Sequence, residues 1–565
     1  MSHARGRGAL YIALIALLMV ATPLATIARV AAQDDGAEKV LRVHHSTYPD
    51  DFDPQKSSFT NEIAILVLAY EGLTRLDSNL ETVPAAAESW EFNEDATEIT
   101  FTLREGLQYS DGSELTAENF RYAIERNCSP RTLGEYQSLL FEIVGCADFA
   151  GLAGDDPSAP AEFTDEEFEA ARQELGVSAP DETTLIIELT QPAPYYATVA
   201  GLWPFFPVKQ EIVEEDPEAW WQEAENHIGN GPFTLTSIDE EQLITFEANE
   251  NYWDGPPILE GIEYVYQGES RIALEAYQAG DLDIVQLDPS LIPEVQEDPE
   301  LSQDFLAYPI AATFNLSFNL TQEPFTDKKV REAFAYGFNR EEYCQVIRNG
   351  DCTATLSWIP EGIPGSIETD QYAFDPEAAR EALAASSYGG PEGLPEIRYF
   401  YNSDDTANTA RAEYIAGMYR DVLGVEIVLE PTEGTALVDL RKNTETYPQM
   451  TIGGWIQDYP DPQNWLSVYW TCDATFAQRF GYCNEEFDEL VQMGDTTLDQ
   501  EERIPFYEEA SQILVDDVAG PFLYNTSQTV LVNDEVTGYT PTAIDAEWPG
   551  QFTSLLTLDI ERAAE

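Results

Sequence analysis

One segment of the chain combines residue types that could hold a charged ligand. It follows the apolar run 449–452 and reads Gly453, Gly454, Trp455, Ile456, Gln457, Asp458 and Tyr459. Glycine lets a backbone approach a ligand closely, and the aromatic rings offer flat apolar walls. A carboxylate between such rings is suited to pair with a ligand cation in a partly dry cleft. The same pattern also fits a proline-rich turn with core tryptophans, and the residues alone leave both interpretations open.

Sequence motifs for catalysis are absent. The chain has 4 histidines, and it contains no Gly-x-Ser-x-Gly, His-Glu-x-x-His or phosphate-loop pattern. A Ser or Cys nucleophile would need one of these histidines as its base. His44 and His45 lie in an expected strand, where neighbouring side chains point to opposite faces, so we expect one buried and one exposed. Carboxylate pairs arise by chance among 104 acids. We predict a protein that is not an enzyme, with no catalytic residue and no cofactor.

The first 32 residues are typical of an export signal. Arg5 and Arg7 precede an apolar run at 9–21, and residues 30–32 fit a cleavage site before Gln33. A membrane-spanning helix needs about 20 apolar residues, so the short run favours cleavage over an anchor. No cysteine is present for lipid attachment. We therefore expect a periplasmic or extracellular protein that is not a lipoprotein.

The six cysteines form three couples along the sequence. An even number in an exported chain favours disulfides. Many pairings are open, and proximity in sequence selects Cys128–Cys146, Cys344–Cys352 and Cys472–Cys483. Zinc binding would need Cys-x2-4-Cys spacing or neighbouring histidines, and neither occurs. We predict no metal site.

The charge balance excludes several partners. The chain has 28 Lys+Arg against 104 Asp+Glu, a formal net charge of −76, which repels nucleic acid and anionic lipid. Hydrophobic residues make up 43%, so the chain is expected to fold into several domains rather than remain disordered. The acidity fits a saline or acidic surrounding, where salt screens the repulsion. It equally fits an ordinary acidic secreted protein.

Strand and helix patterns alternate along the chain, which predicts an α/β fold with partly parallel sheets. Alternating apolar residues predict strands at 98–103, 184–189 and 397–401. Residues 152–182, rich in Asp, Glu, Ala and Pro, predict a surface excursion. Helical periodicity and capping residues predict helices at 117–125, 164–175, 327–338, 376–384, 409–423 and 501–515.

Ordered motifs from about residue 41 to residue 555 carry a family resemblance. The chain resembles the extracytoplasmic solute-binding proteins of ABC importers, family 5, the oligopeptide, dipeptide and nickel class. The motifs occur in the family's order at family-like spacing, which makes the set more specific than any one of them. They include Asp53-Pro54-Gln55, Tyr70-Glu71-Gly72-Leu73, Arg104-Glu105-Gly106-Leu107, Gly229-Asn230-Gly231-Pro232-Phe233, Asn251-Tyr252-Trp253 and Asp458-Tyr459-Pro460-Asp461-Pro462.

The resemblance implies a two-lobed clamshell, the type II periplasmic-binding-protein fold, with an additional subdomain. Its ligand would be buried between lobes that are joined by a strand hinge. Lobe I would comprise 33–80, 200–305 and 525–565. The extra subdomain would span 81–199, and lobe II would span 306–524.

The resemblance also implies ligand-binding residues. In peptide-binding relatives an acid at the position of Asp458 pairs with the α-ammonium group of the ligand, and the preceding segment lines the pocket. Dipeptide-binding relatives place an arginine for the ligand carboxylate in the loop after a lobe II strand. Here that loop, residues 402–405, has no arginine, which favours a longer peptide or another cationic solute. The expected ligand-binding residues are Gly454, Trp455, Ile456, Asp458 and, as a further candidate in a strand returning to lobe I, Tyr524.

The expected function is capture of a small-molecule or oligopeptide ligand for the permease subunits of an ABC importer. The receptor is expected to be monomeric and to bind no nucleic acid. Within binding proteins, the alternative is a receptor for a nickel complex, an opine or a sugar. A secreted hydrolase and a structural or adhesive surface protein are the other classes. The missing nucleophile motifs count against the former, and the missing repeats and sorting signal count against the latter.

Overall fold

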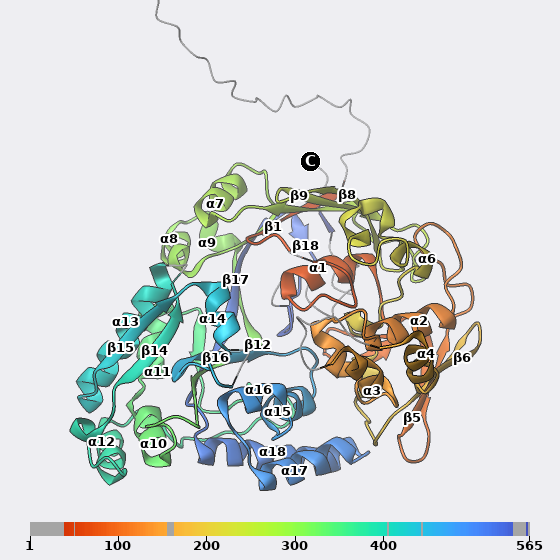
Figure 1. Cartoon of the computed structure of the whole chain (residues 1–565). Helices are drawn as coiled ribbons and strands as arrows, with labels where there is room; N and C mark the ends of the chain where they lie inside the picture. The colour runs from red at the N-terminus through yellow and green to blue at the C-terminus, as the bar shows by residue number, and fades with distance from the viewer. Residues whose placement is uncertain are drawn as a thin grey trace, which may run out of the picture. The chain divides into compact units, whose positions relative to one another are not determined.

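The central element of the fold is a mixed β-sheet (Figure 1). The computed structural model describes residues 39–49, 51–154, 163–403, 406–441, 444–545 and 561–562. Within them, 11 strands form this sheet. In spatial order they are β15 (Ile427–Thr432), β14 (Ile397–Asn402), β16 (Met450–Ile456), β12 (Phe305–Phe318), β17 (Phe522–Val532), β11 (Ile284–Gln286), β1 (Val40–His45), β10 (Gly261–Tyr266), β9 (Leu243–Ala248) and β8 (Phe233–Asp239), with β13 (Cys352–Ala354) beside β17.

Two long strands, β12 and β17, connect the two halves of the sheet. They lie side by side (Figure 1) and pair antiparallel, and the strand-pair register shifts between Pro309 and Thr313. Proline has no N–H for the ladder, which favours an irregularity at this point. β11, β1 and β10 continue the sheet on one side, and β16, β14 and β15 continue it on the other. The strand hinge implied by the resemblance would correspond to these two strands, and the domain boundaries stay a prediction.

The sheet is partly parallel, as the sequence predicted. β1 runs parallel to β10 and β11, and β14 runs parallel to β15 and β16. Parallel strands are usually covered on both faces. His44 and His45 are 3% and 2% exposed, so neither faces solvent. The sequence predicted one exposed histidine, and the cover on both faces of the sheet explains the difference.

The two histidines lie on opposite covered faces of β1. The ring of His45 lies 4.2 Å from that of Tyr264, whose hydroxyl donates to a carbonyl of α1 (Thr60–Ala69). His44 pairs in register with Val265, which packs against the apolar cluster of α7 (Ser270–Gln278). Alternation along the strand therefore moves a side chain between two buried faces, and the expectation of one exposed histidine is wrong.

The expected helices and strands are present with small changes at their ends. The side chain of Asp375 accepts hydrogen bonds from two backbone N–H groups in the first turn of its helix, and Pro376 opens that helix, as the capping pattern predicted. The elements are β5 (Glu98–Leu103), β7 (Thr184–Glu188), α2 (Ala117–Cys128), α4 (Asp165–Gln173), α10 (Lys328–Gly337), α12 (Pro376–Ala385), α13 (Thr406–Leu423) and α18 (Gln500–Asp517).

A second sheet lies in the region expected to form the extra subdomain. Its four strands are antiparallel in the order β4 (Ala87–Phe92), β5, β7 and β6 (Val177–Asp181). Nearby, α4 has no buried residue, which fits the predicted surface excursion, although residues 155–162 lie outside the described residues. Further elements are η1 (Glu135–Leu140), α3 (Cys146–Ala150), α5 (Tyr196–Val199), α6 (Gln210–Val213), α8 (Ile292–Glu297), α9 (Leu301–Asp304), α11 (Arg340–Glu342), α14 (Gly434–Arg441), α15 (Pro462–Trp470), α16 (Thr475–Phe480), α17 (Glu485–Thr496) and the strand pairs β2 (Thr74–Leu76) with β3 (Thr82–Pro84) and β18 (Val536–Thr537) with β19 (Glu561–Arg562).

All three predicted disulfides are present: Cys128–Cys146, Cys344–Cys352 and Cys472–Cys483. Each closes a short loop, which stabilises a fold mainly by restricting the unfolded chain. The proposed export signal, 1–32, lies outside the described residues. Among the helices of the described residues, none has the length and apolar character that crossing a bilayer requires.

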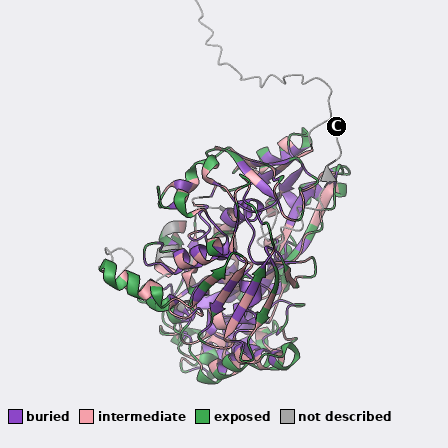
Figure 2. Ribbon diagram, turned by 90° about the vertical axis from the view of Figure 1, so that its right-hand side faces the viewer, coloured by how far each residue is buried: buried purple, intermediate pink, exposed green. Residues whose placement is uncertain are grey.

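Buried residues follow the strands and the inner sides of the helices, while exposed residues gather on the outlying helices (Figure 2). One apolar cluster packs α10 and α13 against the last residues of β12 and against β14. There the rings of Phe318 and Phe325 stack at 4.1 Å, and Phe334 contacts Tyr419 at 4.4 Å. These rings fix the position of α13, the helix that contains Arg411.

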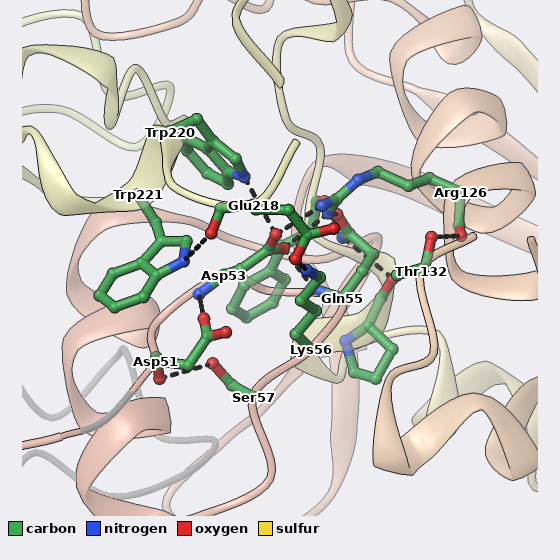
Figure 3. Close-up of polar contacts among 12 residues, drawn as sticks. Asp51, Asp53, Gln55, Lys56, Ser57, Arg126, Thr132, Glu218, Trp220 and Trp221 are labelled. Atoms are coloured by element: carbon green, nitrogen blue, oxygen red, sulfur yellow. Dashed lines mark hydrogen bonds and ion pairs between the residues drawn. The ribbon is translucent and has the colours of Figure 1, made fainter. Parts of the chain in front are cut away.

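A buried polar network holds the first family motif (Figure 3). Arg126 of α2 donates to both carboxylate oxygens of Asp53, at 2.6 and 2.5 Å, and the Trp220 indole donates to Asp53 at 3.0 Å. Burial opposes ionisation, but the guanidinium and these hydrogen bonds hold the pKa of Asp53 below its ordinary value. Arg126 also donates to Gln55 at 2.6 Å. The motif therefore joins distant parts of the scaffold.

Candidate functional site

Asp458 is a buried carboxylate that has no cationic partner among the described residues. It lies after β16 and is 3% exposed. Its Oδ1 accepts a hydrogen bond from the Tyr136 hydroxyl at 3.0 Å, and its Oδ2 accepts one from the Asn464 side chain at 2.8 Å. Burial raises the pKa of Asp458 to about 6, and the two hydrogen bonds only partly oppose this. Since no Lys, Arg or His of the described residues pairs with it, the carboxylate is suited to receive a ligand cation.

The turn that carries Asp458 is fixed by its own side chains. The Oδ1 atom of Asn464 accepts from the Asp458 backbone N–H and from the Trp455 indole, both at 3.0 Å. Asp461 caps α15 through the Gln463 N–H at 2.9 Å and forms a buried ion pair with Arg503 at 2.6 Å. Pro462 opens α15, where its missing N–H is no loss. The Asp-Tyr-Pro-Asp-Pro motif therefore combines a candidate ligand group with a rigid strand-to-helix turn.

Gly454 packs against a neighbouring strand of the sheet and also lines a cavity. It pairs in register with Phe314 of β12, and a Cβ atom at this position would lie 2.6 Å from the Phe314 ring. It also lines a cavity of about 300 Å³, here the glycine cavity. Trp455 contacts Tyr469 and Phe476 edge to face, whereas Ile456 is 37% exposed. The glycine cavity is lined by Phe59, Arg441, Tyr447, Gly454, Tyr469, Phe476, Arg479 and Phe480.

Tyr524 lies in a neighbouring cavity. This arginine cavity has a volume of about 270 Å³, and Arg348, Arg411 and Arg441 are among its lining residues. The Tyr524 ring stacks on Phe314 at 5.1 Å, and the Arg348 guanidinium lies 5.1 Å from the centre of the same ring. Arg441 lines both cavities, so the two adjoin. Tyr524 therefore belongs with the arginines, whereas Trp455 shares the Asn464 acceptor with the Asp458 backbone.

The arginines of this cavity were missed in the sequence analysis. Arg348 pairs with Asp351 at 2.8 Å, but among the described residues neither Arg411 nor Arg441 has an ion pair. Nη1 of Arg411 donates to Asn408 at 2.8 Å, and its buried Nε has no acceptor. Among the described residues, two arginines line one cavity without a carboxylate partner, an arrangement suited to bind an anion.

The arginine expected by resemblance to dipeptide-binding relatives would lie in the loop 402–405. Residues 404 and 405 of that loop lie outside the described residues. Arg411 lies beyond that loop, inside α13, and Arg441 is the last residue of α14. One sequence pattern could have indicated Arg411. A predicted helix follows a strand of the expected lobe II, and this helix has an arginine near its start. Only packing brings it to the same cavity as Arg441.

Several family motifs build the scaffold rather than a cavity. Glu71 accepts hydrogen bonds from the Tyr252 hydroxyl at 2.6 Å and the Trp253 indole at 2.5 Å, so two motifs meet at one carboxylate. Asn230 exchanges two 3.0 Å hydrogen bonds with the Glu71 backbone. The Arg104 guanidinium lies 3.6 Å from the centre of the Trp253 ring. Among the described residues, no three acidic, His or Cys side chains cluster as ligands of a metal ion would.

Known proteins are similar to this chain over most of its length. The family described as "Bacterial extracellular solute-binding proteins, family 5 Middle" matches residues 81–477. The oligopeptide-binding protein OppA of Bacillus subtilis is 25% identical over 519 residues, covering 90% of this chain and 91% of OppA. The periplasmic murein peptide-binding protein MppA of Escherichia coli is 27% identical over 535 residues, covering 93% and 95%.

A solved structure of the Escherichia coli murein tripeptide-binding protein MppA is similar along nearly its whole length. The TM-score is 0.76 at 23% identity, and the match covers 93% of this chain and 99% of that one. The predicted fold class, a two-lobed α/β periplasmic-binding-protein fold, is confirmed by this likeness. The ligand-binding roles of Gly454, Trp455, Ile456, Asp458 and Tyr524 stay predictions.

Proposed function

Because this chain belongs to the bacterial extracellular solute-binding proteins of family 5, we propose that it is the receptor of an ABC importer and captures a peptide-like solute with free termini. The observation that carries the proposal is the buried Asp458 carboxylate, which has two neutral hydrogen-bond donors and no counterion among the described residues. OppA and MppA, which are similar over most of the chain, carry peptide-binding names.

The α-ammonium group of the ligand would bind Asp458. Each carboxylate oxygen accepts one hydrogen bond from the protein and keeps capacity for another. An ammonium group supplies up to three donors and the missing positive charge. The Trp455 ring and the glycine cavity would then receive the first part of the ligand.

The ligand carboxylate would bind in the arginine cavity. Arg411 and Arg441 supply the charge, and the Tyr524 ring forms a wall. The missing arginine in the loop 402–405 therefore does not argue against recognition of a free carboxyl end, because α13 and α14 supply the cations from other positions. A ligand with two free ends would pair its ammonium group with Asp458 and its carboxylate with Arg411 and Arg441. No described carboxylate neutralises these two arginines.

The remaining roles follow from the family. We propose that the closed receptor delivers its ligand to the permease subunits of the importer, that it acts as a monomer, and that it performs no catalysis. We also propose that residues 1–32 direct export and are removed, leaving a periplasmic or secreted protein.

Mass spectrometry of the solute released on denaturation of freshly purified protein tests the ligand class. Calorimetry with trialanine, its N-acetyl form and its C-terminal amide tests the two ends. The free peptide should bind, and each blocked form should bind at least about tenfold more weakly. If the released solute is not peptide-like and trialanine does not bind, the proposed function is wrong.

A further inference from the structure

A third cavity, of about 610 Å³, adjoins the Asp458 turn. One wall comes from the segment around η1 and α5, and the other from α15, α16 and α17. Its volume lies within the range of small-molecule sites, roughly 300–1,000 Å³. We call it the acidic cavity, and the lining residues used here are Glu142, Tyr195, Tyr459, Phe476, Asp488 and Asp495.

Glu142 lines this cavity and has one carboxylate oxygen without a hydrogen-bond partner. Its Oε1 accepts from the Tyr195 hydroxyl at 2.5 Å. Its Oε2 exposes less than 1 Å² to solvent and has no hydrogen-bond partner. Burial raises the pKa of Glu142, since only the tyrosine hydroxyl opposes it. A buried, unpaired acceptor of this kind is costly unless a donor from outside the chain reaches it.

Asp495 faces the cavity from α17. Both of its carboxylate oxygens accept from the Ser467 hydroxyl, at 2.9 and 2.8 Å, and the Tyr507 hydroxyl donates at 2.6 Å. The Arg503 guanidinium, which donates to the same Tyr507 hydroxyl, is engaged by Asp461 through two hydrogen bonds of 2.6 and 3.0 Å. The cavity lining contains acids from both walls and no Lys, Arg or His among the described residues.

The acidic cavity is close to the proposed ligand. Tyr136, which donates to Asp458, precedes the lining residues of η1, and Tyr459 follows Asp458 directly. Phe476 lines both the acidic cavity and the glycine cavity. Aromatic walls beside carboxylates suit a cation on an apolar stem, because the rings contact the stem and attract the charge.

We propose that the acidic cavity is a second compartment of the binding site that accepts an ammonium or guanidinium group, so that the receptor selects ligands carrying a cation besides the amino terminus. The inference rests on the proposed function insofar as the cation belongs to the bound peptide. A free polyamine offers the same chemistry, and the experiment separates the two sources.

Calorimetry near neutral pH with matched tripeptides tests the proposal. The pairs are Lys-Ala-Ala against norleucine-Ala-Ala and Ala-Lys-Ala against Ala-norleucine-Ala, which differ by the ammonium group. The wild-type protein should prefer the lysine member of at least one pair by about tenfold or more. Glu142→Gln and Asp495→Asn should remove most of that preference and leave norleucine peptides bound as before. The control Glu166→Gln makes the same charge change on exposed α4 and should keep the preference.

Spermidine alone is titrated in parallel. Binding that Glu142→Gln abolishes would support the organic-cation site with a free cation as its source. A wild-type protein that shows neither lysine preference nor spermidine binding would overturn the inference, as would a preference that survives in both cavity variants. Melting temperatures confirm that the variants are folded. If norleucine peptides bind through Asp458 but lysine gives no advantage and spermidine does not bind, only this inference fails. If no peptide binds, the proposed function fails. The spermidine titration then shows whether the acidic cavity binds an organic cation.

Discussion

The Tyr136 hydroxyl donates a 3.0 Å hydrogen bond to Asp458 Oδ1 across 322 residues of sequence. Tyr136 lies in η1, inside the loop closed by Cys128–Cys146, and Asp458 lies in the turn after β16. The bond links the region expected as the extra subdomain to the region expected as lobe II. The carboxylate proposed to bind the ligand is thus also a contact between those regions.

Removing this carboxylate should weaken ligand binding strongly. Asp458→Ala leaves a buried ammonium group without its partner, and we expect a loss on the order of 2–5 kcal/mol for a peptide with a free amino terminus. Tyr136→Phe removes one hydrogen bond and should cost on the order of 1 kcal/mol. Calorimetry measures both. Unchanged affinity of Asp458→Ala would show that another group binds the ammonium.

Ligand affinity should depend on pH through Asp458. Burial raises its pKa to about 6 in the ligand-free protein, and its neighbours Tyr136, Asn464 and Tyr459 are uncharged at that pH. An ammonium ligand binds the ionised form. Affinity should therefore be full above about pH 6 and fall by up to about tenfold per pH unit below it. Calorimetry from mildly acidic to neutral pH measures the slope, and Asp458→Asn should flatten it.

The same raised pKa makes Asp458 a stability cost in the empty receptor. The pKa of the folded state lies above the ordinary value of 3.8, so the stability that the protonated group contributes at low pH is lost as the pH rises through about 6. Asp458→Asn should raise the free energy of unfolding at neutral pH by about 1–2 kcal/mol. The gain stays below the full effect of the pKa shift because an amide oxygen can serve only one of the two donors. Denaturant unfolding without ligand, at neutral and at mildly acidic pH, measures it. A variant less stable than the wild type at neutral pH would contradict the argument.

The sequence predicted local structure well because the signals for it are local. Asp375-Pro376 predicted a helix start, and proximity of the cysteines predicted the disulfides. The burial of His44 and His45 could not be predicted in this way, since it depends on helices that cover both faces of β1. Arg411 was missed because its role arises from the packing of α13 beside α14. Among 104 acids, no local pattern distinguishes Glu142 and Asp495 from the solvated majority.

Each disulfide closes a loop that contributes to a cavity. Cys128–Cys146 encloses Tyr136 and Glu142, Cys344–Cys352 encloses Arg348, and Cys472–Cys483 encloses Phe476. The double variant Cys344→Ser, Cys352→Ser should lower stability by about 2–4 kcal/mol and loosen Arg348. Because Arg348 is paired with Asp351 and lies against the Tyr524 ring, we expect trialanine and its amide to lose affinity to a similar degree. Calorimetry at a temperature where the variant stays folded makes the comparison, and a loss confined to the free-carboxylate peptide would mean that Arg348 itself binds the ligand carboxylate.

Arg411 and Arg441 should determine how the receptor discriminates a free carboxyl end. Methionine keeps much of the apolar stem of arginine and removes its charge, so Arg411→Met and Arg441→Met test the charge at little cost in packing. Each should reduce the affinity for trialanine by about tenfold or more while changing the affinity for trialanine amide much less. Arg398→Met is a matched control, because Arg398 pairs with Glu430 at 2.6 Å and does not line the arginine cavity. Since the amide lacks the anionic group, the ratio of the two affinities isolates the interaction with the carboxylate from any general loosening of α13. A ratio that is the same in the wild type and in both variants would mean that the carboxyl end of the ligand lies elsewhere.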